Sequence, residues 1–151
     1  MKKYNSILLV EDDRKKIDDI SEFVKTKFPE SKLTTVKSFR GGLKEIFTNN
    51  YDLLLLDMTI PKWDDDSLGE SIEYENFGGF NIMKEMKRKK KTLPTIVITM
   101  FNKFVANDKF VSIDSIETLC QGNFEFYLGL VYYSSKNEEW KDKLESVICK
   151  S

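Results

Sequence analysis

The sequence predicts an α/β domain in which a five-stranded parallel sheet is covered by helices on both faces. Short apolar runs alternate with amphipathic stretches along the whole chain, and no internal repeat, low-complexity tract or linker interrupts them. The 151 residues suffice to bury one full core. Strands that alternate with helices pair in parallel through right-handed crossovers. We therefore expect residues 1–151 to form a single domain of the (βα)5 type.

Each expected strand is a short apolar run. DLLLL is the most apolar run and is expected at the centre of the sheet, whereas the more polar KLTTV is expected near an edge. The five expected strands are Ser6–Val10, Lys32–Val36, Asp52–Leu56, Thr95–Thr99 and Phe124–Tyr133.

The expected helices carry apolar residues at helical spacing. The first begins at Asp13, places Ile17, Ile20 and Phe23 on one stripe, and ends before Pro29. Ser38 is a suitable N-cap for the second. The last three helices are expected over Gly79–Lys90, Ser115–Cys120 and Lys136–Cys149.

Composition excludes several classes of function. The chain has no histidine, which removes Ser-His-Asp and Cys-His nucleophile pairs and histidine-ligated zinc. Lys plus Arg number 24 against 25 for Asp plus Glu, a balance that argues against nucleic acid or a membrane surface as a partner. Two distant cysteines and the lack of a signal peptide or membrane helix predict a cytoplasmic protein.

Acidic residues follow two of the predicted strands. Glu11, Asp12 and Asp13 come after the first strand, Asp57 after the third, and Thr99 closes the fourth. Ligands of such sheets bind at the carboxyl ends of the strands, so these groups are expected to converge. Carboxylates about 4 Å apart repel by about 4 kcal/mol at an effective dielectric near 20, which predicts a bound cation. Oxygen ligands without histidine favour Mg2+ or Mn2+.

Such a site can also do chemistry. Magnesium commonly completes its coordination with phosphate oxygens, and a carboxylate beside that phosphate can act as a nucleophile, while the Thr99 hydroxyl can bind a phosphoryl oxygen. The alternative is that Asp12, Asp13 and Ser38 only cap helices. Capping accounts well for Asp13, but it does not explain an aspartate that closes an apolar strand at position 57.

The motifs ILLVEDD, LLLLDMTIP and LPTIVITMF, in this order over nearly the whole chain, resemble the CheY-like receiver domains of two-component response regulators. The resemblance implies a doubly wound, flavodoxin-like sheet with strand order 2-1-3-4-5. It also implies that Glu11 and Asp12 hold Mg2+, that Asp57 is both phosphoacceptor and metal ligand, that Thr59 gives its backbone carbonyl to the metal, and that Thr99 is the switch hydroxyl.

The chain departs from the family pattern at two places. Receivers usually carry a lysine at the end of the fifth strand, where this chain has Val131 or Tyr132; Lys103 and Lys136 are the candidates to replace it. Residues 62–78 are expected to form an inserted acidic loop between the third strand and the third helix. Such a loop could act as a lid or a partner contact, and an exposed acidic loop is favoured over a second metal site.

The resemblance implies a stand-alone, phosphorylation-dependent switch of a phosphorelay, not a conventional enzyme. Asp57 would accept a phosphoryl group from a histidine kinase or a phosphotransfer protein. In receivers one aromatic residue of the fifth strand moves with the switch hydroxyl, and Tyr127 is a candidate for it, with the register of the strand left open. The face of helix 4, strand 5 and helix 5 would then bind a downstream protein or a second copy. The alternative, favoured by the missing lysine, is a phosphorylation-independent pseudo-receiver that acts as a protein–protein interaction module.

Overall fold

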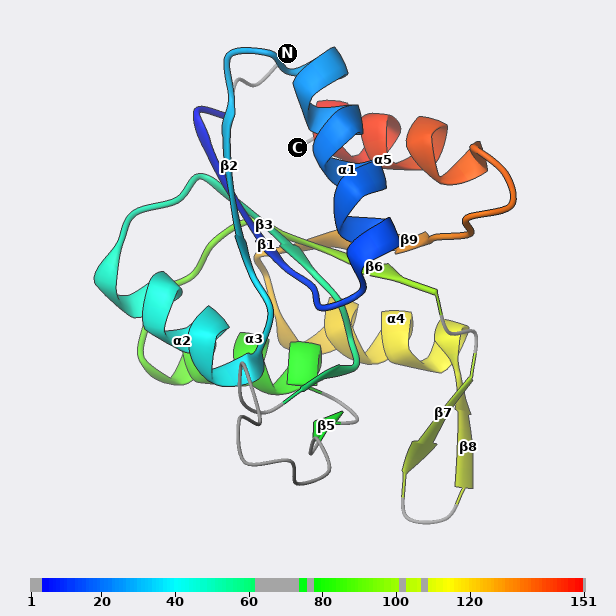
Figure 1. The fold of residues 1–151 in the computed structure, drawn as a ribbon. Helices are drawn as coiled ribbons and strands as arrows, with labels where there is room; N and C mark the ends of the chain where they lie inside the picture. Colours follow the sequence, from blue (N-terminus) through cyan, green and yellow to red (C-terminus); the bar gives the residue numbers. More distant parts are fainter. Residues whose placement is uncertain (1–3, 62–73, 76–77, 101–102, 107–108, 151) are drawn as a thin grey trace, which may run out of the picture.

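The computed structural model describes residues 4–61, 74–75, 78–100, 103–106 and 109–150 (Figure 1). Its main sheet has five strands in the order β2-β1-β3-β6-β9, and each neighbouring pair is parallel. This is the predicted order 2-1-3-4-5. The strands are β1 (Ser6–Val10), β2 (Lys32–Val36), β3 (Leu53–Leu56), β6 (Thr95–Thr99) and β9 (Tyr127–Tyr132).

Helices cover both faces of the main sheet, as predicted. In Figure 1, α1 and α5 lie on one face, and α2, α3 and α4 lie on the other. Each helix buries an apolar stripe; that of α5 consists of Trp140, Leu144, Val147 and Ile148. The helices are α1 (Arg14–Lys27), α2 (Phe39–Thr48), α3 (Gly78–Arg88), α4 (Ile113–Asn123) and α5 (Glu139–Lys150).

The main sheet separates two apolar cores. Leu53 and Leu55 of β3 face the core beneath α1 and α5, whereas Leu54 and Leu56 face the core on the other side. All four are fully buried, because successive side chains of a strand point to opposite faces and both faces are covered. This explains why the sequence of the central strand is continuously apolar.

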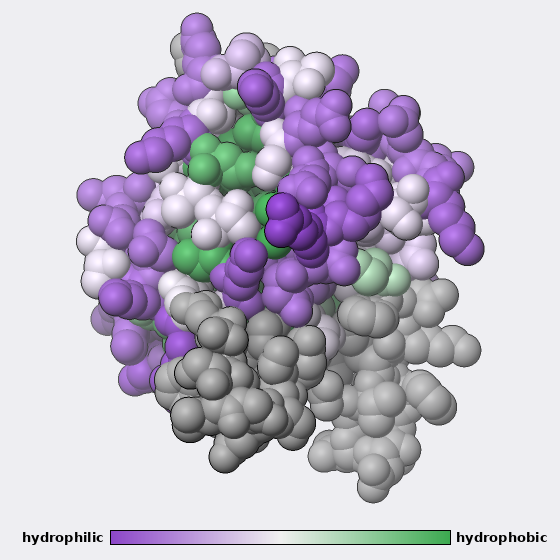
Figure 2. Space-filling view, viewed as in Figure 1, coloured by the Kyte–Doolittle hydropathy of each residue, from purple (hydrophilic) through white to green (hydrophobic). Residues whose placement is uncertain are grey.

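Few large apolar side chains reach the surface of the described residues. Figure 2 shows a mostly hydrophilic face over α1, α2 and β2, with small apolar areas between the charged side chains. The exposed large hydrophobic residues among those described are Leu119 of α4 and Tyr132 of β9. No helix in the described part of the chain combines the length and the apolar character that crossing a bilayer requires.

Several boundaries differ from the prediction. Strand β9 begins at Tyr127, three residues later than predicted, because the backbone N–H of Phe124 still donates to Cys120 at the end of α4. Helix α4 is longer than predicted because the Ser112 side chain caps it, accepting from the Ser115 N–H. Helix α5 begins at Glu139 because side-chain hydrogen bonds hold residues 134–139 in turns.

Two short antiparallel hairpins were not predicted. Strand β4 (Ile60–Pro61) pairs with β5 (Tyr74–Glu75), and β7 (Lys103–Ala106) pairs with β8 (Lys109–Ser112). Strands of two to four residues are too short for their apolar period to be recognised. Most of the predicted inserted loop, 62–73 and 76–77, lies outside the described residues. Its last residue, Gly78, already belongs to α3.

Candidate functional site

Three carboxylates meet at the carboxyl end of the main sheet. Glu11 and Asp12 follow β1, and Asp57 follows β3; each offers a carboxylate oxygen within 4.8 Å of the others. The pairing of β1 with β3 places Val10 beside Leu56, and the Asp57 N–H donates to the Val10 carbonyl at 3.1 Å. Glu11 and Asp57 are buried and Asp12 is half-buried. The predicted acidic cluster is thus present.

Backbone N–H groups fix two of these carboxylates. Glu11 Oε2 accepts hydrogen bonds from the N–H groups of Asp12 and Asp13, both at 3.1 Å. Asp57 Oδ1 accepts one from Met58 N–H at 2.8 Å. Such bonds stabilise a buried negative charge and hold its position.

Capping, the alternative interpretation, is correct for two of the predicted polar residues. Asp13 caps α1 by accepting from Lys16 N–H at 2.9 Å. Ser38 caps α2 in the same way, by accepting from Gly41 N–H at 2.9 Å. Asp12 instead contributes to the carboxylate cluster.

A buried lysine, which the sequence analysis missed, completes the cluster. The Lys16 side chain is fully buried; its Nζ donates to the Ile98 carbonyl at 2.6 Å, forms an ion pair with Glu11 Oε1 and lies 3.3 Å from Asp57 Oδ1. One signal could have revealed it. Lys16 stands four residues before Ile20 and seven before Phe23, which places it on the apolar stripe of α1.

Burial makes ionisation of the acids unfavourable. Burial raises the pKa of Glu11 to about 7. The neighbouring charge of Asp57 also raises this pKa, whereas the charge of Lys16 lowers it. Burial also raises the pKa of Asp57, although the charge of Lys16 lowers it. The pKa of Asp12 is raised by burial and by the neighbouring charge of Asp57. One ammonium group neutralises one carboxylate of the three, so a cation bound here would stabilise the ionised cluster.

The carboxylates open onto a hollow of about 340 Å³. The residues that line it are the four predicted to hold a metal ion, Glu11, Asp12, Asp57 and Thr59, together with Asp13, Arg14 and Met100. Lys16 and Thr99 are not among the described residues that line the hollow, and both are fully buried. The structure therefore brings four predicted site residues together around this hollow and leaves Thr99 outside it.

The described residues do not place either predicted substitute lysine at the acids. Lys136 is exposed and lies in the turn before α5. Lys103 begins β7 opposite Ser112, and its side chain lies outside the described part of the structure. The expectation for Tyr127 is wrong: it pairs with Thr95 at the amino end of the sheet, whereas Thr99 pairs with Tyr132.

The start of α3 packs directly against the backbone at Asp57. The Gly79 N–H donates to the Met58 carbonyl at 3.0 Å. A Cβ atom at position 79 would lie 2.5 Å from the Asp57 carbonyl oxygen, which is closer than real Cβ contacts allow. Glycine at this position therefore permits the close approach that shapes one side of the site.

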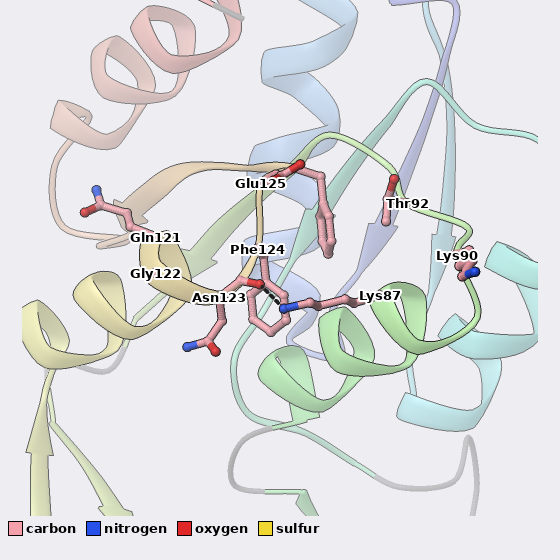
Figure 3. Close-up of a pocket in the computed structure, with 9 residues that line it drawn as sticks. Lys87, Lys90, Thr92, Gln121, Gly122, Asn123, Phe124 and Glu125 are labelled. Carbon is pink, nitrogen blue, oxygen red and sulfur yellow. Dashed lines mark hydrogen bonds between the residues drawn. The ribbon is translucent and has the colours of Figure 1, made fainter.

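A larger hollow, of about 720 Å³, lies at the opposite end of the sheet (Figure 3). It is lined by the C-terminal ends of α3 and α4 and the segment that follows α4. Lys87 Nζ donates there to the Asn123 carbonyl at 2.8 Å. Its charged lining residues, Lys87, Lys90 and Glu125, are all exposed, so it lacks the buried charges of the carboxyl end.

Comparisons with known proteins agree with this architecture. No family model matches the chain. An uncharacterised protein of Sinorhizobium fredii is 24% identical over 141 residues, covering 92% of this chain and 93% of that protein. The Detocs response regulatory protein DtcB of Enterobacter cloacae is 26% identical over 141 residues, covering 91% and 94%.

Solved structures of receiver domains superpose on nearly the whole chain. A CheY-like receiver domain protein of Methanospirillum hungatei has a TM-score of 0.63 at 15% identity, covering 97% of this chain and 92% of its own. The Mn2+-bound response regulator Rcp1 has a TM-score of 0.65 at 17% identity, covering 95% and 91%. TrrA of Thermotoga maritima, in complex with Mg2+ and BeF, gives 0.52 at 22%, covering 95% and 98%. The chain therefore has the CheY-like fold that these receiver domains of response regulators share.

Proposed function

We propose that the protein is a phosphorylation-dependent signalling switch in which Asp57 accepts a phosphoryl group. The observation that carries this proposal is the buried Asp57 carboxylate, grouped with Glu11 and Asp12 beside a hollow of about 340 Å³. Carboxylates with perturbed pKa values in a cleft are typical of a functional site. Similarity to a response regulatory protein over 141 residues supports the same role.

The donor set fits Mg2+ or Mn2+. It consists of carboxylate oxygens, which these hard cations prefer, and the described chain contributes no histidine or cysteine to it. Glu11, Asp12, Asp57 and the backbone carbonyl of Thr59 would hold the ion. When bound, it neutralises charge that develops on the phosphoryl oxygens. Two similar structures contain Mn2+ or Mg2+ with BeF.

The protein's own residues would perform the transfer. One carboxylate oxygen of Asp57 forms a bond to phosphorus, and the bond between phosphorus and the donor breaks, with its electron pair leaving on the donor. The donor would be a phosphohistidine of a kinase or of a phosphotransfer protein, whose ring nitrogen keeps that pair. The chain thus modifies itself and is not a conventional enzyme.

Phosphorylation would change the surface formed by α4, β9 and α5, where a partner binds. Thr99 closes β6, and its carbonyl accepts from the Tyr133 N–H at 2.8 Å, so a movement of Thr99 reaches the end of β9 directly. The exposed Leu119 and Tyr132 lie on α4 and β9. Exposed apolar residues on this face suit a downstream protein or a second copy of the chain.

Acetyl phosphate tests the proposal. The protein is incubated with acetyl phosphate and Mg2+ and its intact mass is measured; we expect one added phosphoryl group. Asp57→Asn should abolish the adduct. Asp52→Asn is the matched control, since Asp52 is exposed at the other end of β3 and its side chain only accepts from backbone N–H groups. An adduct that survives Asp57→Asn contradicts the proposal.

A phosphorylation-independent interaction module is the second candidate. One observation favours it: the Lys16 ammonium already pairs with Glu11 and Asp57, which partly neutralises the cluster without a metal. Failure of the protein both to bind Mg2+ and to form an adduct with acetyl phosphate would favour such a module.

A further inference from the structure

We propose that Lys16 is a positioning residue that supplies, from the first turn of α1, the ammonium group absent from the end of β9. It would hold Asp57 in place for phosphorylation and connect it to the strand that ends in Thr99. The inference rests on the proposed function and concerns the same site. The end of β9 presents Val131, Tyr132 and Tyr133 where a strand-end lysine would stand.

The contacts of the Lys16 ammonium join three strands. Glu11 follows β1, Asp57 follows β3, and the Ile98 carbonyl belongs to β6, directly before Thr99. A charge-assisted hydrogen bond to Ile98 therefore links the phosphoacceptor to the switch strand through one side chain. A rearrangement of Asp57 on phosphorylation would reach β6 by this route.

The position of Lys16 is unfavourable unless the cluster requires it. Lys16 is the third residue of α1, where the positive end of the helix dipole repels a cation. Burying an ammonium group adds a large desolvation cost. The neighbouring Lys15 shows the ordinary arrangement: its side chain is 65% exposed and pairs with Asp19 at 2.7 Å. The ion pairs with Glu11 and Asp57 offset the cost of burying Lys16, and among the described residues Lys15 forms no ion pair with these two acids.

Lys16 lies behind the carboxylates instead of in the hollow in front of them. The hollow is lined by Glu11, Asp12, Asp57 and Thr59, whereas Lys16 is fully buried and outside that lining. Both Lys16 Nζ and Met58 N–H meet the same oxygen of Asp57, Oδ1. The proposal therefore assigns attack on phosphorus to Oδ2, with Oδ1 held in place.

A tryptophan lies close enough to report on Lys16. The Tyr133 ring centroid is 5.9 Å from Lys16 Nζ and 5.3 Å from the Trp140 ring. The Tyr133 hydroxyl also donates to Asp19 of α1 at 2.5 Å. Displacement of the ammonium group would change the surroundings of Tyr133 and hence the emission of Trp140. Trp63→Phe makes Trp140 the remaining tryptophan of the chain.

The test compares Lys16→Met with Lys15→Met in the full chain, and Lys16→Gln serves if the first variant folds poorly. The rate of adduct formation with acetyl phosphate and the affinity for Mn2+ by calorimetric titration are both measured. We expect either Lys16 variant to slow phosphorylation by about 10- to 100-fold, as loss of a charge-assisted hydrogen bond implies. Affinity for Mn2+ should rise, because a nearby positive charge is removed. Lys15→Met should change both by less than about twofold, as an exposed ion pair implies.

Trp140 gives the second measurement. In the Trp63→Phe background, full phosphorylation should shift its emission when Lys16 is present and leave it unchanged in Lys16→Met. A loss of packing alone would not produce that dependence on phosphorylation.

The outcomes separate the two proposals. Faster phosphorylation together with tighter Mn2+ binding would mean that Lys16 blocks the ion, and a fall in both would mean a purely structural role; either overturns the inference. Unchanged rates overturn it too, while an Asp57-dependent adduct leaves the proposed function standing. If the unaltered protein forms no adduct, the proposed function fails and this inference fails with it.

Discussion

The two ends of the main sheet differ in the charges that they bury. The carboxyl end has the smaller hollow, of about 340 Å³. Glu11 and Asp57, which line it, are buried, and so is Lys16 behind them. The amino end has the larger hollow, of about 720 Å³, and the charged residues that line it are exposed. Burying charge has a cost that only a specific arrangement offsets, so buried charge supports the proposed site at the carboxyl end better than the volume of a hollow would.

The direction of the strands and helices accounts for this difference. Helix N-termini lie at the carboxyl end, and backbone N–H groups there donate to a carboxylate, as the two hydrogen bonds to Glu11 Oε2 show. Helix C-termini lie at the amino end, where carbonyl groups attract cations; Lys87 donates to the Asn123 carbonyl from a solvated position. The charged side chain that binds at the amino end thus stays exposed to water, whereas the charged side chains at the carboxyl end are buried.

The largest expected effect on stability comes from replacing Lys16 at the carboxyl end, with the replacement of Lys87 at the amino end as its comparison. Lys16→Met should lower the free energy of unfolding by about 3–5 kcal/mol at pH 8, because it leaves buried carboxylates without their partner. Lys87→Met should change it by less than about 0.5 kcal/mol, as is usual for an exposed position. Urea denaturation without divalent ions measures both. Equal losses would remove the distinction between the two ends.

Titration of Glu11 should make stability depend on pH. Its pKa is about 7 in the folded protein against 4.5 for the free group. Between these values the folded state keeps a proton that the unfolded state has lost, so the free energy of unfolding should fall as pH rises, by on the order of 3 kcal/mol. The contribution is fully present below pH 4.5 and absent above about pH 7. Denaturation at several pH values measures the slope, and Glu11→Gln should flatten it; a variant with an unchanged slope would refute the assignment.

Two glycines sharpen the same comparison. Gly79→Ala should destabilise the fold by about 1–3 kcal/mol, since its Cβ would overlap the backbone at Asp57. Gly122 lines the hollow at the amino end, and a Cβ there meets nothing within 4 Å. Gly122→Ala should therefore stabilise helix α4 by about 0.5 kcal/mol. Thermal unfolding of the two variants measures the difference, and a shift of the same sign in both would contradict it.

The smallest expected effect concerns the cap of α1. Asp13→Ala removes the acceptor for Lys16 N–H and should cost about 1 kcal/mol of stability. Asp13→Asn keeps an acceptor at the same place and should cost clearly less. Urea denaturation of the pair measures the cap, and an equal loss in both variants would show that Asp13 acts through its charge.

Much of the architecture could be predicted because it depends on local pattern. The central strand is continuously apolar because both of its faces are buried, and that pattern also located Asp57 at its end. The two short hairpins could not be predicted, since their strands contain only two to four residues. Tyr127 was assigned to the wrong end because the register of β9 depends on the turn after α4 and on an irregularity between Thr95 and Ile96.

The sequence by itself determined the order of strands and helices and placed acidic residues after β1 and β3. Three consecutive basic residues, Arg14, Lys15 and Lys16, begin α1, and only the tertiary structure shows that the Lys16 ammonium group lies among the carboxylates, whereas Arg14 lines the hollow. Helix propensity barely distinguishes these side chains. The burial of Ile20 and Phe23 against the sheet fixes the rotation of α1, and that rotation directs Lys16 toward Glu11, Asp57 and the Ile98 carbonyl while Lys15 remains in solvent.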